Sequence, residues 1–73
     1  MDNMVHPRVN NDYHIGLFAG AWFAKRDMTF TKEQVEIEAL EVYEWSANLI
    51  VLERSEFITG FVEGYQGYID GIV

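Results

Sequence analysis

The chain has 73 residues, a net charge of −7 at neutral pH and no cysteine. Without cysteine it forms neither a disulfide nor a zinc site of the cysteine type, so a core of this size depends on packing and association. The negative charge belongs to the second half, where residues 33–73 hold nine acids and a single base. Nucleic acids and anionic membranes attract basic surfaces, so we expect no direct binding to either.

No apolar run is long enough to cross a bilayer. The longest covers residues 15–24, about half of the roughly 20 residues that a transmembrane helix needs. The first residues lack the basic leader of a secretory signal peptide. Because 49% of the residues are hydrophobic, the chain is rich enough in apolar side chains to fold. We expect a single domain over residues 1–73, located in the cytoplasm.

The first third of the chain predicts an arm and a helix. Residues 1–11 show no periodic pattern and are expected to form a flexible N-terminal arm. Asp12 is a suitable N-cap for a first helix over about residues 13–28. Lys25 and Arg26 then lie in the last turn, where cations suit the negative end of the helix dipole.

The middle of the chain predicts a second helix over about residues 31–53. Thr31 and Gln34 have the spacing of a capping box, which favours a helix start at this point. Residues 46–52 are also compatible with a strand, because periodicity does not separate the two structures in a short apolar run.

A third helix is expected over about residues 56–72, after an N-cap at Ser55. Glycine inside a helix costs about 1 kcal/mol relative to alanine, and close approach of another backbone is the usual compensation. All six glycines fall within the predicted first and third helices. They are Gly16, Gly20, Gly60, Gly64, Gly67 and Gly71. The sequence therefore predicts an all-α, compact three-helix domain with glycine-mediated close packing.

Two interpretations of the glycine stripes remain open: they face each other within one molecule, or one of them mediates self-association. Apolar residues surround the first helix, and Ile15, Phe18 and Trp22 point away from its glycines. A homodimer or a partner protein would cover this side. The residues expected at helix-packing or dimer contacts are Gly16, Gly20, Trp22, Gly60, Phe61, Gly64 and Tyr68.

The second helix carries an acidic face opposite its core-facing residues. This face is either a solvated surface that keeps the protein soluble or a surface that docks into a basic groove of a partner. In the second case charge accelerates the encounter and the apolar side chains supply adhesion. The predicted partner-binding residues are Glu33, Glu36, Ile37, Leu40, Glu41, Glu44 and Trp45.

Residues that carry catalysis are scarce. The two histidines, His6 and His14, have no serine or cysteine nucleophile arranged with them, and the glycine-rich end lacks the lysine of a phosphate-binding loop. A metal bound by the histidines, or a pocket that pairs His14 with an acid, are the alternatives. We expect no enzyme activity, no metal site and no cofactor.

The chain resembles the small acidic inhibitors that bacteriophages encode, of the anti-CRISPR, anti-restriction and DNA-mimic type. The resemblance rests on length, absent cysteines, exposed-looking aromatics and a series of acids: Glu33, Glu36, Glu38, Glu41 and Glu44. It implies a non-enzymatic inhibitor or modulator of a host nucleic-acid-handling enzyme with a basic groove, such as a CRISPR, restriction or polymerase complex. Carboxylates would stand where phosphates bind, in the host cell cytoplasm. The first half departs from this class because it is nearly neutral. The alternative function is a self-associating module that forms a homodimer through glycine-aromatic helix faces.

Overall fold

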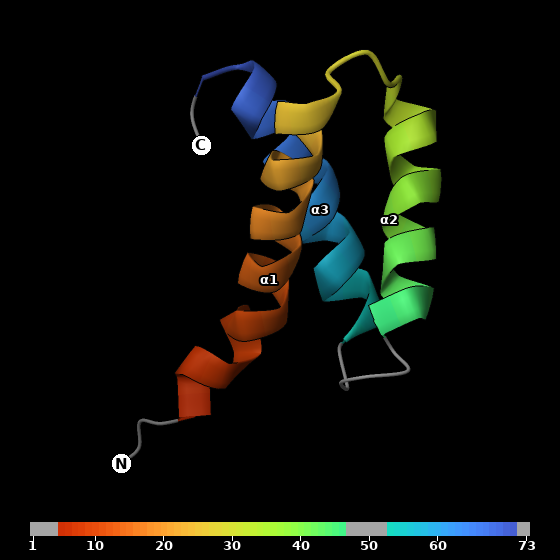
Figure 1. Cartoon of the computed structure of the whole chain (residues 1–73). Coiled ribbons are helices and arrows are strands. Elements are labelled where there is room, and N and C mark those ends of the chain that lie inside the picture. Colours follow the sequence, from red (N-terminus) through yellow and green to blue (C-terminus); the bar gives the residue numbers. More distant parts are fainter. Residues whose placement is uncertain (1–4, 47–52, 72–73) are drawn as a thin grey trace.

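The computed structural model describes the backbone of residues 5–46 and 53–71, and the side chains of residues 12–46 and 53–71. These residues form three helices, α1 (Val5–Arg26), α2 (Lys32–Ser46) and α3 (Arg54–Ile69), and no strand. The prediction of an all-α, three-helix domain is confirmed. Figure 1 shows that α1 and α3 run in the same direction, whereas α2 returns in the opposite direction beside α3.

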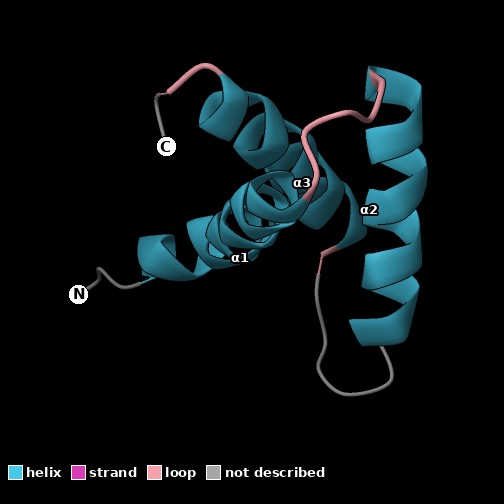
Figure 2. Cartoon of the chain, turned by 45° about the horizontal axis from the view of Figure 1, so that its top comes forward, coloured by secondary structure: helices cyan, strands magenta, loops and turns pink. Residues whose placement is uncertain are grey.

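Helix α3 is the centre of the fold. It packs against both other helices, while α1 and α2 make little direct contact. Figure 2 shows α1 crossing α3, with α2 standing to one side. The core residues are at most 2% exposed, and half of them come from α3: Ala24, Val35, Ala39, Phe57, Phe61 and Tyr65. The aromatic side chains of α3 are therefore the main element of the core.

The glycines of α1 let its backbone touch that of α3. A Cβ atom at Gly16 would lie 2.2 Å from the carbonyl oxygen of Phe57, and one at Gly20 would lie 2.0 Å from the carbonyl oxygen of Phe61. Two such atoms cannot approach so closely, because van der Waals repulsion rises steeply below about 3.5 Å. Only glycine fits at either position without a shift of α3.

The glycines of α3 meet α1 in the same way. A Cβ atom at Gly60 would lie 2.1 Å from the carbonyl oxygen of Tyr13, and one at Gly64 would lie 2.0 Å from that of Leu17. Each glycine thus meets the carbonyl group of the residue three positions before a glycine of the other helix. The interface has an approximate two-fold pattern, which is typical of helices that pack through a Gly-xxx-Gly spacing. Glycine-mediated close packing is confirmed.

The connection between α1 and α2 is fixed to α3 by one buried hydroxyl. The N–H of Phe30 donates to Oη of Tyr65 at 2.9 Å, and this hydroxyl donates to the carbonyl oxygen of Asp27 at 2.9 Å. The predicted capping box follows directly. The N–H of Thr31 donates to Oε1 of Gln34 at 2.9 Å, and the N–H of Gln34 donates to Oγ1 of Thr31 at 3.2 Å.

The first helix begins at Val5 rather than near residue 13. Residues 5–11, which were assigned to the N-terminal arm, form its first turns, and these turns extend past the other helices in Figure 1. Pro7 lies in the first turn, where a backbone N–H has no partner within the helix, so the missing donor costs nothing there. Residues 1–4 of the predicted arm lie outside the described residues.

The predicted caps Asp12 and Ser55 are wrong, because neither residue precedes a helix. Asp12 lies inside α1, and its carboxylate accepts a hydrogen bond from the N–H of Glu53 at 2.8 Å. Glu53 is the N-cap of α3 and makes no capping bond with its own side chain. A carboxylate from α1 thus supplies the negative charge that the positive end of the α3 dipole favours.

The third helix ends at Ile69 rather than at residue 72. Gly71 follows it with a φ of +81°, and its N–H donates to the carbonyl oxygen of Tyr68 at 3.1 Å. The prediction that every glycine lies inside a helix is wrong for Gly71, which instead ends α3 in the left-handed conformation that glycine adopts most easily. The second helix is described as far as Ser46, which is helical, and the other residues of the possible strand at 46–52 lie outside the described residues.

Candidate protein-binding surfaces

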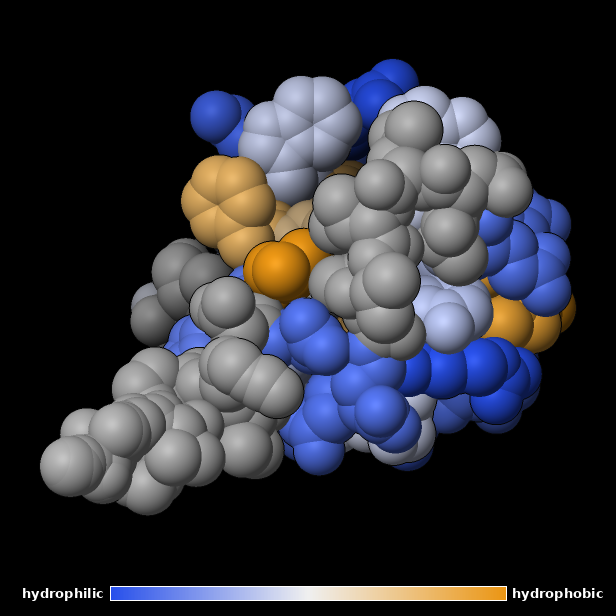
Figure 3. All heavy atoms as spheres, turned by 90° about the horizontal axis from the view of Figure 1, so that it is seen from below, coloured by the Kyte–Doolittle hydropathy of each residue, from blue (hydrophilic) through white to orange (hydrophobic). Residues whose placement is uncertain are grey.

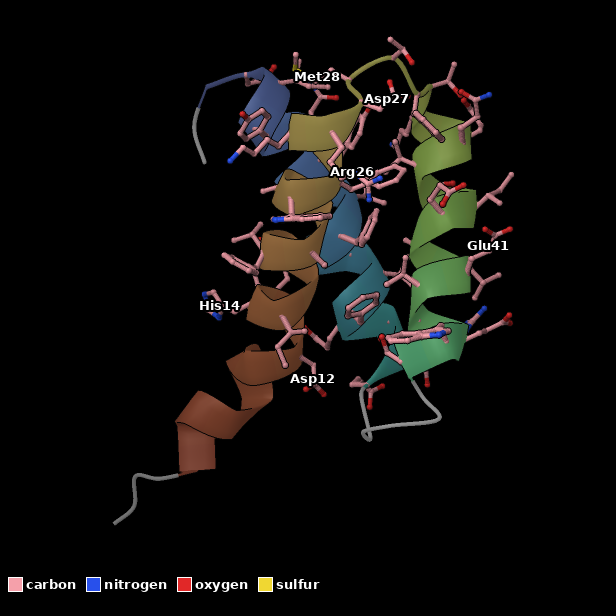
Figure 4. The ribbon with its side chains drawn as sticks, in the orientation of Figure 1. Asp12, His14, Arg26, Asp27, Met28 and Glu41 are labelled. Carbon is pink, nitrogen blue, oxygen red and sulfur yellow. The ribbon has the colours of Figure 1, made fainter. Side chains whose placement is uncertain are left out.

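The acidic face of α2 forms as predicted, on the side of the helix that turns away from α3. Val35 and Ala39 are buried against α3, whereas Ile37 is 57% exposed and Trp45 is 67% exposed. Figure 4 shows Glu41 pointing away from the other two helices. The exposed members are Glu33, Glu36, Ile37, Glu41, Glu44 and Trp45. Together with half-buried Leu40 they make up the surface that we name the acidic face.

One edge of the acidic face borders a groove between α2 and α3. The groove has a volume of about 460 Å³, and Glu36 and Leu40 line its α2 side. Two cations, Lys32 and Arg54, also line it. The acidic face therefore has a mixed-charge edge towards α3, and its purely acidic part lies farther out on α2.

A second exposed surface lies on α1. Phe18 is 75% exposed and Trp22 is 55% exposed, although both are large apolar side chains. The guanidinium carbon of Arg26 lies 5.3 Å from the centre of the Trp22 ring, within the range of a cation–π interaction. These three residues recur every four positions on one side of α1, and we name them the α1 stripe.

Two hollows flank the α1 stripe. One, of about 500 Å³, has Phe23, Val42 and Phe61 on its walls and opens between α1 and α2. The other, of about 220 Å³, lies beside Tyr68 and Lys25. Figure 3, seen from below, shows hydrophobic atoms at the surface on the α1 side on the left and again on the α2 side on the right. The molecule therefore exposes apolar surface on two of its helices.

The residues predicted at helix-packing or dimer contacts divide into two groups. The four packing glycines and Phe61 are buried between the helices of one molecule, whereas Trp22 and Tyr68 reach the surface beside the hollows. In the single molecule the α1–α3 contact already occupies the backbones of these glycines. The sequence analysis did not include Arg26 in an exposed surface. Its spacing of four residues from Trp22 could have indicated that both lie on the same side of the helix.

His14, the histidine singled out in the sequence, lies on α1 next to Tyr13. His14 is exposed, and its ring meets the Tyr13 ring edge to face at 5.5 Å. The Tyr13 hydroxyl donates to Oε1 of Glu63, and this hydrogen bond raises the pKa of Tyr13 above its ordinary value. Among residues 12–46 and 53–71, no three acidic or histidine side chains lie close enough together to hold a metal ion.

Comparisons of the chain with models of protein families, with curated proteins and with solved structures found no match. In the part of the chain that the structure describes, no helix combines the length and the hydropathy that crossing a membrane requires.

Proposed function

We propose that this protein is a non-enzymatic modulator, most simply an inhibitor, that inserts the acidic face of α2 into a basic groove of a nucleic-acid-handling enzyme. The observation that carries the proposal is the composition of this face. Four exposed glutamates surround two exposed apolar side chains, Ile37 and Trp45, on one rigid helix. A face that serves only solubility has no need of these apolar side chains.

The charge spacing of the acidic face suits a groove built for a single nucleic-acid strand. From Glu33 to Glu44 the helix rises by about 16 Å, at 1.5 Å per residue. Four carboxylates over this length give about one charge per 5 Å, compared with about one per 3.4 Å along one strand of DNA and one per 1.7 Å along the duplex. We therefore propose partial mimicry, in which the carboxylates occupy some of the phosphate positions.

The apolar side chains supply adhesion that a phosphate backbone does not have. Burial of a large apolar side chain contributes about 1.5–3 kcal/mol. Tryptophan is also enriched among the residues that dominate binding at protein interfaces. Ile37 and Trp45 lie two turns apart on the same side of α2, so one flat partner surface can bury both. This contribution explains how a face of modest charge density competes with nucleic acid.

The proposed target is a cytoplasmic CRISPR, restriction or polymerase complex. Such enzymes hold nucleic acid in basic grooves, where the carboxylates of α2 would be attracted. The test is affinity capture from a lysate of the native host with the tagged full chain, followed by displacement of the bound protein with heparin or with increasing salt. The expected result is a nucleic-acid-binding protein that both treatments release.

A charge-matched pair of variants makes this test specific for α2. The first variant combines Glu36→Lys with Glu41→Lys, and the control combines Glu56→Lys in α3 with Asp70→Lys at its C-cap, so both change the net charge equally. The α2 variant is expected to lose the captured protein at least about tenfold, whereas the control retains it. Equal capture by the two variants, or a captured protein that heparin does not displace, would contradict the proposal.

A further inference from the structure

We infer that a second copy of this chain docks through its α2 on the α1 stripe. The docking surface of α2 consists of Ile37, Glu41 and Trp45, which recur every four positions and which we name the α2 stripe. The inference goes beyond the proposed function and does not depend on it. The contact joins two copies of this chain, so it needs no other partner protein.

The two stripes hold four of the five most exposed large apolar side chains of the described residues. Phe18 and Trp45 are 75% and 67% exposed, and Ile37 and Trp22 are 57% and 55% exposed. A protein of this size that leaves such side chains in water usually covers them in an assembly. Both stripes run along single helices, so a helix-against-helix contact covers them together.

The stripes are complementary in charge. The α1 stripe ends in the cation of Arg26, with Lys25 beside it, whereas the α2 stripe has the carboxylate of Glu41 at its centre. A contact between two α1 stripes would bring cations together, and a contact between two α2 stripes would bring carboxylates together. Only the contact of α1 with α2 places opposite charges against each other.

The spacing of the stripes matches as well. Both repeat every four residues, which is about 6 Å along a helix. Suppose that Arg26 lies opposite Glu41. Four residues along the helices, Trp22 then lies opposite Ile37 if the two helices run in parallel, or opposite Trp45 if they run antiparallel. In either direction the indole ring meets an apolar side chain, so charge and apolar contacts are satisfied in the same register.

The α1 surface also has room for an incoming side chain. The hollow of about 500 Å³ beside the stripe is walled by Phe23, Val42 and Phe61, which are apolar. An indole or isoleucine side chain from the second copy fits such a space. The α2 stripe of the same molecule does not reach this hollow, since Glu41 points away from α1 (Figure 4). The contact therefore forms between two molecules.

Analytical ultracentrifugation of the purified full chain tests the inference. The expected result is a mass above that of the monomer at high micromolar concentration, which falls towards the monomer as salt is raised, because opposite charges hold the contact. Arg26→Glu and Glu41→Arg are each expected to weaken association at least about tenfold. Circular dichroism of both variants establishes that the helices remain folded.

A mixture of the two variants provides the decisive result. Each variant alone places like charges at the contact, whereas an equimolar mixture places opposite charges there again, so association is expected to return. Glu36→Arg, which makes the same charge change at the far edge of the acidic face, is the matched control and should associate like the original protein. A monomer at every concentration and salt, or a mixture that stays monomeric, would overturn the inference. Equal weakening by Glu36→Arg would overturn it too.

Discussion

The two interfaces of α3 are built on different principles. Against α1, backbone meets backbone at four glycines, and a single added methyl group has no space at any of them. Against α2, contact is made by side chains such as Val35 and Ala39, and a groove of about 460 Å³ remains open along one side. The α1–α3 interface therefore has no space for larger side chains at its glycines, whereas α2 is packed less tightly against α3.

This difference explains how a small domain combines a defined fold with a large exposed surface. The contact between α1 and α3 places Phe57 and Phe61 at the centre, where they form one cluster with Val35 and Ala39 of α2. Helix α2 then needs to bury only a narrow strip, so most of its circumference is available for charged side chains. We conclude that α1 and α3 hold the structure, and that α2 mainly presents a surface.

The largest expected effect is the loss of folding stability when a glycine at the contact of α1 with α3 is replaced. Gly20→Ala and Gly64→Ala each force α1 and α3 apart, and overpacking of this kind costs about 1–3 kcal/mol. Chemical denaturation followed by circular dichroism measures the loss. Gly71→Asn is the control: Cβ has open space there, and asparagine tolerates the left-handed conformation, so a change within about 0.5 kcal/mol is expected. Equal losses at Gly20 and Gly71 would show that the close approach is unimportant.

The attachment of α2 is expected to be sensitive to one hydroxyl group. Tyr65→Phe leaves the N–H of Phe30 and the carbonyl oxygen of Asp27 without their partner, at a cost of about 1–2 kcal/mol. Hydrogen exchange is expected to quicken in α2 and its connection more than in α1 and α3. Tyr68→Phe is a suitable control, because Tyr68 is only partly buried and borders the hollow beside Lys25 of α1 instead of the turn before α2. Uniform loss of protection across all helices would contradict the separate roles of the two interfaces.

The smallest expected effect concerns pH and the turn after α1. Oδ1 of Asp27 accepts bonds from the hydroxyl and the N–H of Thr29, at 2.6 and 3.0 Å, and these bonds lower the pKa of Asp27 below its ordinary value. A lowered pKa in the folded state stabilises the protein above the ordinary pKa, and this contribution disappears as pH falls through the lowered value. In Thr29→Val, which keeps the N–H, NMR titration is expected to show an Asp27 pKa nearer to normal. An unchanged pKa would show that the hydroxyl does not hold the carboxylate.

The sequence predicted those features that repeat along one helix. The exposed acidic face of α2, with Ile37 in it, and the buried side opposite it follow from a period of 3.6 residues, which any helix imposes. The capping box of Thr31 and Gln34 is equally local. For the candidate site, this local periodicity correctly assigned the acidic face, because a helix face is defined by its own sequence.

The features that the sequence did not predict involve contacts between helices. Asp12 has the chemistry of a cap for the helix that follows it, but its partner is the N–H of Glu53 on a distant segment. Tyr65 looks like an ordinary core ring, yet its hydroxyl anchors a turn more than thirty residues earlier. The position of Arg26 over Trp22 is the exception: both residues lie in α1, and their four-residue spacing is a local signal that the sequence analysis did not use.

By itself, the sequence determined that this protein is a three-helix domain with glycine-based packing and an acidic face on its second helix, because helix periodicity and side-chain volume are local properties. Only the tertiary structure decided that the glycines of α1 and α3 pack against each other within one molecule, and that Phe18 and Trp22 remain exposed. The physical reason is that a glycine stripe and an apolar stripe each fit several partners, and the choice among them is made by the packing of whole helices.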